Sequence, residues 1–371
     1  MRERAAMLAV VVAVACLDVG FVQAGPPSDD EYRLWAERAV HEGPEELSRE
    51  TSQWETSRLR GLADRLRRGS PSTAQLASVA HLQLAQSAYD AGHDRRAADH
   101  IGAGLACLGL RPQDGAGALA GRRRSDAGPV GSLGIAVPGS VRRDLQPLAR
   151  QWLLTLAYWL QSRLLPEPAA SAFAALLSAN PDDGEALLGA GTVQELLAFP
   201  ANLVAGDGGG VAGAASRAAR AQAAETSYQR VLEIDPHQAE ARVRLGRVLL
   251  ERGDLPTASD QLTRVLEGSD AHASWLAHLL LGRLSESEGH LDVAVAHYRA
   301  ASDLEPRHQA AHLALSHALF RSGSASSAKE ILVDAFGDPF DGSPDGWAAY
   351  QMGLVDRLSV GMATLRSMVQ P

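Results

Sequence analysis

Three histidines near the C-terminal third of the sequence have a spacing that could bind a metal ion. His308 and His312 are four residues apart and therefore share a face of a helix, and His317 follows one turn and one residue later. Two imidazoles at this spacing can bind zinc, but a catalytic zinc site also needs a third ligand and a base. The intervening residues lack the glutamate of a zinc-protease motif. We therefore expect solvated or groove-lining histidines and no metal.

Other chemical motifs are equally incomplete. The segment 208–213 has Gly-x-Gly-x-x-Gly spacing, but no readable strand delivers it to a helix as dinucleotide binding requires. Asp338, Asp341 and Asp345 resemble a calcium loop in composition, without its spacing or its closing glutamate. Cys107 lies in an apolar helical pattern with no nearby base, which is typical of a buried hydrophobic residue. The sequence therefore predicts no cofactor and no enzymatic activity.

The composition excludes some partners and favours helices. The formal net charge of −9 argues against nucleic-acid binding, which requires a basic surface. Hydrophobic residues make up 46% of the 371 residues and aromatic residues only 5%, so the core is rich in Ala and Leu, as in closely packed helices. Lys329 is the only lysine among 35 basic residues, which is typical of arginine codon use in a high-GC bacterium.

The first 24 residues have the features of an export signal. Arg2 and Arg4 precede an apolar run over 5–14, and Ala24 ends the small-residue pattern of a signal-peptidase site. We expect an exported chain in the periplasm or cell envelope. Two alternatives stay open, namely a lipoprotein whose Cys16 carries the lipid and an uncleaved membrane anchor. We expect membrane contact only through the signal peptide or through lipidation at Cys16.

The remainder is organised around a repeated helix–turn–helix unit. The segment 275–308 shows it most clearly, and its spacing fits a 34-residue period. Its characteristic positions are His278, Leu281, Gly282, Ser285, Ala294, Tyr298 and Pro306. Small residues at these positions allow two helices to approach closely, bulky ones pack between them, and proline ends the second helix. Such units cannot bury their apolar faces alone, so neighbouring units must stack.

About six units follow this spacing in phase, and the pattern resembles the tetratricopeptide repeat (TPR) family over roughly 230 residues. This resemblance implies an all-α, right-handed α-solenoid of TPR-like helix–turn–helix repeats with helical caps. Where the family often has an aromatic residue in the first helix, this chain has Leu153, Leu187, Arg242, His278 and His312. The family's peptide-carboxylate clamps therefore cannot be transferred to this chain.

The pattern divides the chain into six segments. We expect a signal peptide over 1–24, an N-terminal helical cap over 25–72, a TPR-like repeat over 73–111, a disordered insertion rich in Gly and Arg over 112–146, a TPR array over 147–342 and a C-terminal capping helix over 343–371. Within the array, removing about 21 residues near 199–219 restores the period, so a second insertion should separate the two helices of one unit.

The resemblance also implies where a partner would bind, because in this family the first helix of each unit lines the concave surface. The exposed positions predicted there are Gln86, Tyr89, Tyr158, Gln161, Thr192, Glu195, Arg247, Leu250, Arg283, Glu286, His317 and Phe320. Mixed polar, arginine and aromatic side chains suit an extended peptide or a helix of a partner protein. We therefore predict a non-enzymatic protein-binding scaffold. The alternative is an envelope lipoprotein or accessory subunit that positions a separately encoded redox or hydrolytic enzyme.

Overall fold

The computed structural model describes residues 34–35, 63, 67–69, 71–113, 130, 133–136, 146–199, 211–336, 350 and 357–369. The chain divides into two compact units, each described by itself. Unit 1 comprises Met1–Trp152 and Gly361–Pro371, and unit 2 comprises Leu153–Val360. The predicted signal peptide, with Cys16, lies outside the described residues, as does most of the predicted N-terminal cap.

Unit 1 is built on one helical hairpin. Its elements are α5 (Pro71–Asp90), α6 (Asp94–Cys107), β1 (Arg111–Gln113), β2 (Gly134–Ala136), the start of α8 (Pro147–Ser162) and the end of α19 (Leu358–Val369). Trp35 and Ala63 lie buried in one apolar cluster with alanines of α5. Trp152 donates from Nε1 to the Ser78 carbonyl oxygen over 2.9 Å, which anchors α8 on α5.

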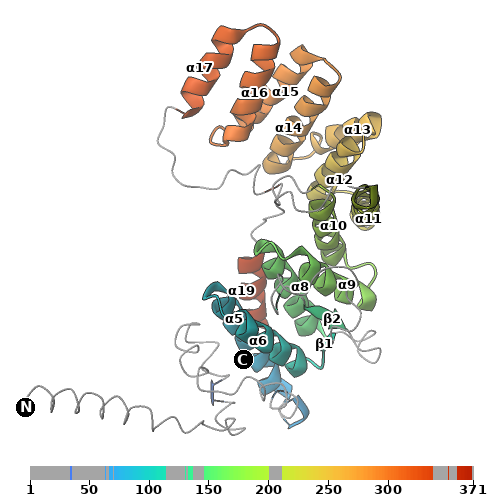
Figure 1. The fold of residues 1–371 in the computed structure, drawn as a ribbon, viewed down its shortest axis with the longest axis vertical. Helices are drawn as coiled ribbons and strands as arrows, with labels where there is room; N and C mark the ends of the chain where they lie inside the picture. The colour runs from blue at the N-terminus through green and yellow to red at the C-terminus, as the bar shows by residue number, and fades with distance from the viewer. Residues whose placement is uncertain are drawn as a thin grey trace, which may run out of the picture. The chain divides into compact units, whose positions relative to one another are not determined.

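Unit 2 contains most of the repeats. Its helices after α8 are α9 (Pro166–Ala179), α10 (Gly184–Ala198), α11 (Val211–Ile234), α12 (Ala239–Glu251), α13 (Leu255–Val265), α14 (Ala271–Ser287), α15 (Leu291–Leu304), α16 (Gln309–Arg321) and α17 (Ala325–Phe336). Consecutive helices pack as antiparallel hairpins, and α14 to α17 lie side by side as two of them (Figure 1). Successive first helices, from α10 to α16, also contact one another. The predicted all-α solenoid is confirmed.

The turn inside each hairpin explains a recurring glycine. Gly253 has φ +83° and Gly289 has φ +83°, a left-handed conformation that glycine adopts without steric cost. The equivalent turn between α8 and α9 holds Leu164 at φ 56°, where a Cβ atom costs about 1 kcal/mol or more. The repeat geometry therefore persists even where the sequence does not supply the preferred residue.

Small residues on the first helices face bulky ones on the second helices, as the repeat pattern predicts. A Cβ atom at Gly282 would lie 2.5 Å from Tyr298 Cε1, and one at Gly246 would lie 2.6 Å from Leu262 Cγ. These separations are far below van der Waals contact, so only glycine permits the observed helix approach. Tyr298 and Leu262 are buried at these contacts.

A pair of side chains also recurs across the hairpins, 19 residues apart. His81 and His100 place their Nδ1 atoms 3.1 Å apart in α5 and α6, and His278 and His297 place theirs 3.0 Å apart in α14 and α15. Burial, and then the charge of Arg96, lowers the pKa of His100 to about 4. Burial likewise lowers the pKa of His81, to which the neighbouring His100 adds. Each imidazole of the α5–α6 pair is therefore neutral near pH 7.

Both predicted insertions differ from the structure at their ends. Within 112–146, β1 and β2 form an antiparallel ribbon that pairs Pro112 with Ile135. Val130 and Ile135 are buried, and the Val130 amide donates to the Asp94 carboxylate over 3.2 Å. The prediction of disorder is wrong for these residues, because they bury apolar side chains that offset the entropy of ordering. Residues 114–129 lie outside the described residues.

The second insertion is shorter than predicted. The prediction placed it near 199–219, but α11 already begins at Val211. Five of the residues from 212 to 219 are alanines, the residue with the highest helix propensity, so they extend the second helix of the unit backwards.

The end of the C-terminal helix packs on the first hairpin of unit 1. It was predicted to cap the array over 343–371, but in α19 the Met362 sulfur accepts from Gln86 Nε2 of α5 over 3.8 Å. On the last hairpin, Leu313 and Val333 are 49% and 59% exposed. The apolar stripe of α19 required burial, but its spacing did not specify the surface that would bury it. Among the described residues, no helix is both long and apolar enough to cross a bilayer.

Candidate functional site on the inner face

The twelve side chains predicted to line the groove do not share one environment. Three are exposed, namely Arg283, His317 and Phe320. Four are partly buried, namely Gln86, Tyr89, Tyr158 and Glu286. Five are buried, namely Gln161, Thr192, Glu195, Arg247 and Leu250. The prediction of exposure is wrong for these five, because neighbouring side chains close over them. "Inner face" below means the surface formed in unit 2 by the first helices α8, α10, α12, α14 and α16.

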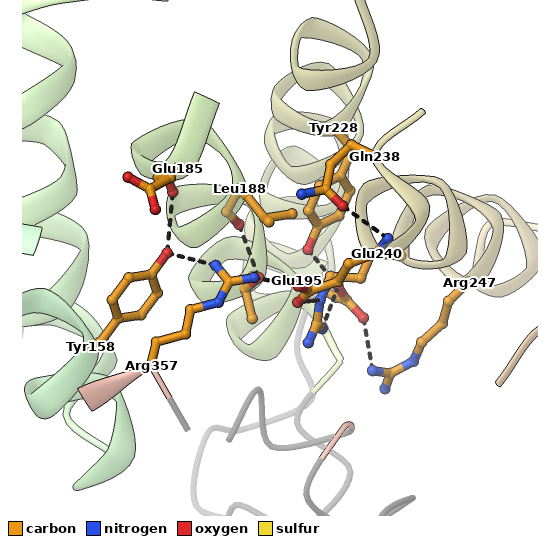
Figure 2. Close-up of polar contacts among 11 residues, drawn as sticks. Tyr158, Glu185, Leu188, Glu195, Tyr228, Gln238, Glu240, Arg247 and Arg357 are labelled. Atoms are coloured by element: carbon orange, nitrogen blue, oxygen red, sulfur yellow. Dashed lines mark hydrogen bonds and ion pairs between the residues drawn. The ribbon is translucent and has the colours of Figure 1, made fainter. Parts of the chain in front are cut away.

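Glu195 of α10 is the centre of a buried ion-paired cluster. Its carboxylate accepts from Arg247 Nη1 over 2.7 Å and from the Tyr228 hydroxyl over 2.6 Å (Figure 2). It also lies 3.5 Å from Arg244 Nη1. The side chains of Glu195, Arg244 and Arg247 are at most 4% exposed. Buried charges are tolerated only when they are paired and hydrogen-bonded. This cluster therefore ties α10 and α11 to α12.

Tyr350, from the C-terminal part of the chain, covers this cluster. Its ring centroid lies 4.7 Å from Arg244 Cζ and 5.5 Å from Arg247 Cζ, within the range of cation–π contacts. The residue is 4% exposed. Burial, and then the charge of Glu195, raises the pKa of the Tyr350 hydroxyl well above its ordinary value. The ring therefore remains neutral and stacks on two buried guanidinium groups.

Arg357 makes a second contact between the C-terminal part and the inner face. Its Nη1 donates to the Tyr158 hydroxyl over 2.6 Å, its Nη2 pairs with the Glu240 carboxylate, and its Cζ lies 5.2 Å from the Tyr158 ring centroid (Figure 2). Burial raises the pKa of Tyr158 to about 12, although the Arg357 charge opposes this shift. Burial alone would raise the pKa of Glu240, but Arg244 and Arg357 outweigh burial and lower it.

The inner face continues toward α16 as a ladder of ion pairs between neighbouring units. Arg283 Nη1 lies 2.7 Å from Glu251 Oε1, and the Glu286 carboxylate accepts from Arg321 over 2.7 Å. His317 Nδ1 lies 2.9 Å from the same carboxylate. Burial alone would raise the pKa of Glu286, but the hydrogen bonds and nearby charges outweigh burial and lower it. Because each of these basic side chains contacts a carboxylate of the preceding unit, the ladder orients them.

Phe320 stands out at the end of this ladder because it is 67% exposed. It occupies the place on α16 that Glu195 occupies on α10 and Glu286 occupies on α14, three residues after His317. In unit 1, Gln86 and Tyr89 of α5 are partly buried, and Gln86 contacts Met362. Within unit 2, the predicted residues therefore do not form a single open groove, because several of them are buried.

The three histidines considered for metal binding have separate neighbours. His308 stacks on Trp275 with ring centroids 4.7 Å apart, and His312 Nε2 lies 2.9 Å from the Pro306 carbonyl oxygen. His317 pairs with Glu286. Across the described part of the chain, no three His, Cys, Asp or Glu residues form a group that could hold a metal ion. Cys107 is a buried thiol, and Asp338, Asp341 and Asp345 lie outside the described residues.

Sequence reasoning missed the residues that close the inner face. Glu240 and Arg244 are four residues apart on α12, which is a readable helix pairing, and their side chains lie 3.0 Å apart. No local signal connects Arg357 with Tyr158, since 199 residues separate them. Long-range contacts of this kind appear only once the chain is folded.

Comparison with known families identifies repeats in unit 2. The tetratricopeptide repeat family matches residues 215–280 and 286–351. The chain is similar to the cellulose synthase 2 operon protein C of Komagataeibacter xylinus, with 31% identity over 137 residues. That match covers 36% of this chain and 10% of the relative's length.

Solved structures show a weaker likeness. MamA from Desulfovibrio magneticus RS-1 is 21% identical with a TM-score of 0.40, covering 51% of this chain and 93% of the other. PilF of Pseudomonas aeruginosa is 13% identical with a TM-score of 0.43, covering 58% and 88%. A tetratricopeptide repeat protein from Parabacteroides merdae is 13% identical with a TM-score of 0.45, covering 79% and 93%.

Proposed function

Since residues 215–280 and 286–351 are tetratricopeptide repeats, we propose that the chain is a non-enzymatic scaffold of the bacterial cell envelope. On this proposal it binds a peptide or a helix of another protein on its inner face. Stacked helix pairs suit this role because each unit adds one helix to a continuous surface whose side chains a partner can contact together.

The observation that carries the proposal is Phe320 beside the ion-pair ladder of α14 and α16. An aromatic side chain that is 67% exposed is ready to lose apolar surface to a partner. The neighbouring Glu286 holds Arg321 and His317 in place, so little side-chain entropy remains to be lost on binding. Binding energy in such interfaces is concentrated in a few aromatic and arginine anchors. Phe320 is the anchor we propose.

The envelope location rests on the sequence and on a relative. The charged start, apolar run and Ala24 site have the order of an export signal, and Cys16 leaves lipidation open. The relative in Komagataeibacter xylinus is named for a cellulose synthase operon, and a polysaccharide synthase operon is compatible with an envelope assembly. No observation on the described residues favours the alternative of an accessory subunit for a redox or hydrolytic enzyme.

The test is site-specific photo-crosslinking in the bacterium of origin. A photoreactive amino acid replaces Phe320 in the full chain, and the matched control replaces Val293 on α15, which is 49% exposed on a second helix. We expect one protein to be crosslinked from position 320 and not from position 293. Each crosslinked protein is then purified, and its binding to the unlabelled chain is measured.

Two outcomes contradict the proposal. One is equal crosslinking from both positions, or none from either. The other is a purified partner whose Kd is unchanged by Phe320→Ser. We expect Phe320→Ser to weaken the Kd by about tenfold or more, and Val293→Ser to change it less than about twofold. Export is tested separately by fractionating cells that express the wild-type chain and a chain lacking residues 1–24.

A further inference from the structure

The chain already places an aromatic side chain on its own inner face. Tyr350 lies over the guanidinium groups of Arg244 and Arg247, at 4.7 and 5.5 Å, and is 4% exposed. The two arginines do not depend on Tyr350 for their charge balance, because Glu195 and Glu240 pair with them. The surface that receives the ring is therefore built by residues of α10 and α12, without the help of Tyr350.

Arg357, a basic residue that follows Tyr350 in the C-terminal part of the chain, occupies a second place on the inner face. Arg357 donates to the Tyr158 hydroxyl and pairs with Glu240, which also pairs with Arg244. Glu240 therefore connects the two places, since one of its oxygens accepts from Arg244 of the cluster under Tyr350 and the other from Arg357. The side chain of Arg357 is 25% exposed, so water reaches this ion pair. A segment that offers the same two groups, a basic side chain for the solvated ion pair and a ring for the face of the two arginines, can compete for these contacts.

The receiving surface has a defined chemistry. Paired arginines under a ring select an aromatic side chain, because the face of a π-system is attracted to cations. A carboxylate beside a tyrosine ring and hydroxyl selects a guanidinium or ammonium group. Position and chemistry together specify a protein segment that presents an aromatic residue followed by a basic one.

We propose that this part of the inner face, formed by Tyr158, Glu240, Arg244 and Arg247, is a binding site for a partner segment carrying an aromatic and a basic side chain. Tyr350 and Arg357 occupy it as a ligand built into the chain. A partner must displace them, so the site is closed until such a segment arrives. This inference rests on the proposed function, because it names the chemistry of the partner that the scaffold binds.

The test uses a fluorescent synthetic peptide of this chain's own residues 346–360. Its binding is measured by anisotropy to the full wild-type chain and to the variant Tyr350→Ser with Arg357→Ser, whose own occupants are removed. An attached segment competes at an effective concentration in the millimolar range. We therefore expect the variant to bind the peptide at least about tenfold more tightly than the wild-type chain does.

Two controls define specificity. A peptide with the same two substitutions should not bind the variant chain. The chain variant Val333→Ser, at a residue 59% exposed on α17, should bind the original peptide as weakly as the wild-type chain does. If the double variant loses helical content, Arg357→Gln alone replaces it, and we expect it to bind the peptide several-fold more tightly than the wild-type chain.

The proposal is overturned if the well-folded variant does not bind the peptide, if it binds the substituted peptide equally well, or if wild-type and variant chains have equal affinities. If Arg357→Gln is used, equal affinity of this variant and the wild-type chain for the peptide likewise overturns the proposal. The assay needs no partner from the cell. Peptide binding without crosslinking at position 320 refutes the proposed function alone, and crosslinking without peptide binding refutes this inference alone.

Discussion

Replacing Glu195 with glutamine tests how strongly the buried cluster holds α10 to α12. The substitution keeps the size of the side chain and removes its charge, so Arg247 loses its partner at 2.7 Å while only 4% of its side chain is exposed. Removing one member of a buried ion pair typically costs about 3–5 kcal/mol, because the remaining charge stays buried and unpaired. We expect the opening free energy of the backbone amides in α10 and α12 to fall by this amount. Native-state hydrogen exchange measures it.

The matched control is an exposed ion pair. Asp182 pairs with Arg230 at 2.7 Å, but their side chains are 57% and 44% exposed, so we expect Asp182→Asn to have no measurable effect. Combining Glu195→Gln with Arg247→Met should recover stability relative to Glu195→Gln alone, because no unpaired charge remains and Arg244 keeps Glu240. A change below about 1 kcal/mol for Glu195→Gln would refute the reasoning.

Three further predictions concern packing, pH and capping. Gly282→Ala should lower the urea midpoint of unfolding, because overpacking against Tyr298 costs about 1–3 kcal/mol. This cost outweighs the gain of about 1 kcal/mol in helix propensity. A raised midpoint contradicts this. The pKa of His100 is lowered to about 4 by burial, and that of His81 is lowered too. Protonating either imidazole therefore costs more free energy in the folded chain than in the unfolded chain, so the free energy of unfolding is highest above pH 6.5. The part due to His100, about 3 kcal/mol, is lost as the pH falls from 6.5 toward 4. Hydrogen exchange should show α5 and α6 losing protection relative to α10, which contains no histidine; equal loss contradicts this. Asp270→Ala removes the N-cap of α14 and should cost about 1 kcal/mol in the unfolding of that helix; an unchanged value contradicts this.

The repeat architecture could be predicted because its determinants are local. Gly246 and Leu262 belong to one hairpin, and so do Gly282 and Tyr298, and in both a small residue faces a bulky one. A period of 34 residues repeats this contact, so sequence spacing alone identifies the pairs.

The state of the inner face could not be predicted from the same pattern. The register of α10 and α12 identified Glu195 and Arg247 as members of one surface, and the structure brings them together as an ion pair. Their burial depends on Tyr350 and other residues distant in sequence. The spacing of α19 likewise showed an apolar stripe, but not that Met362 would contact α5. Periodicity identifies a face to be covered and leaves its cover undetermined.

The most direct test of the central claim is the affinity of the chain for the partner crosslinked at position 320, measured by calorimetry with wild-type, Phe320→Ser and Val293→Ser chains. If the inner face binds the partner, Phe320→Ser weakens the Kd by about tenfold or more while Val293→Ser leaves it near the wild-type value. Equal affinities of the three chains would contradict the claim and place the interaction away from the inner face.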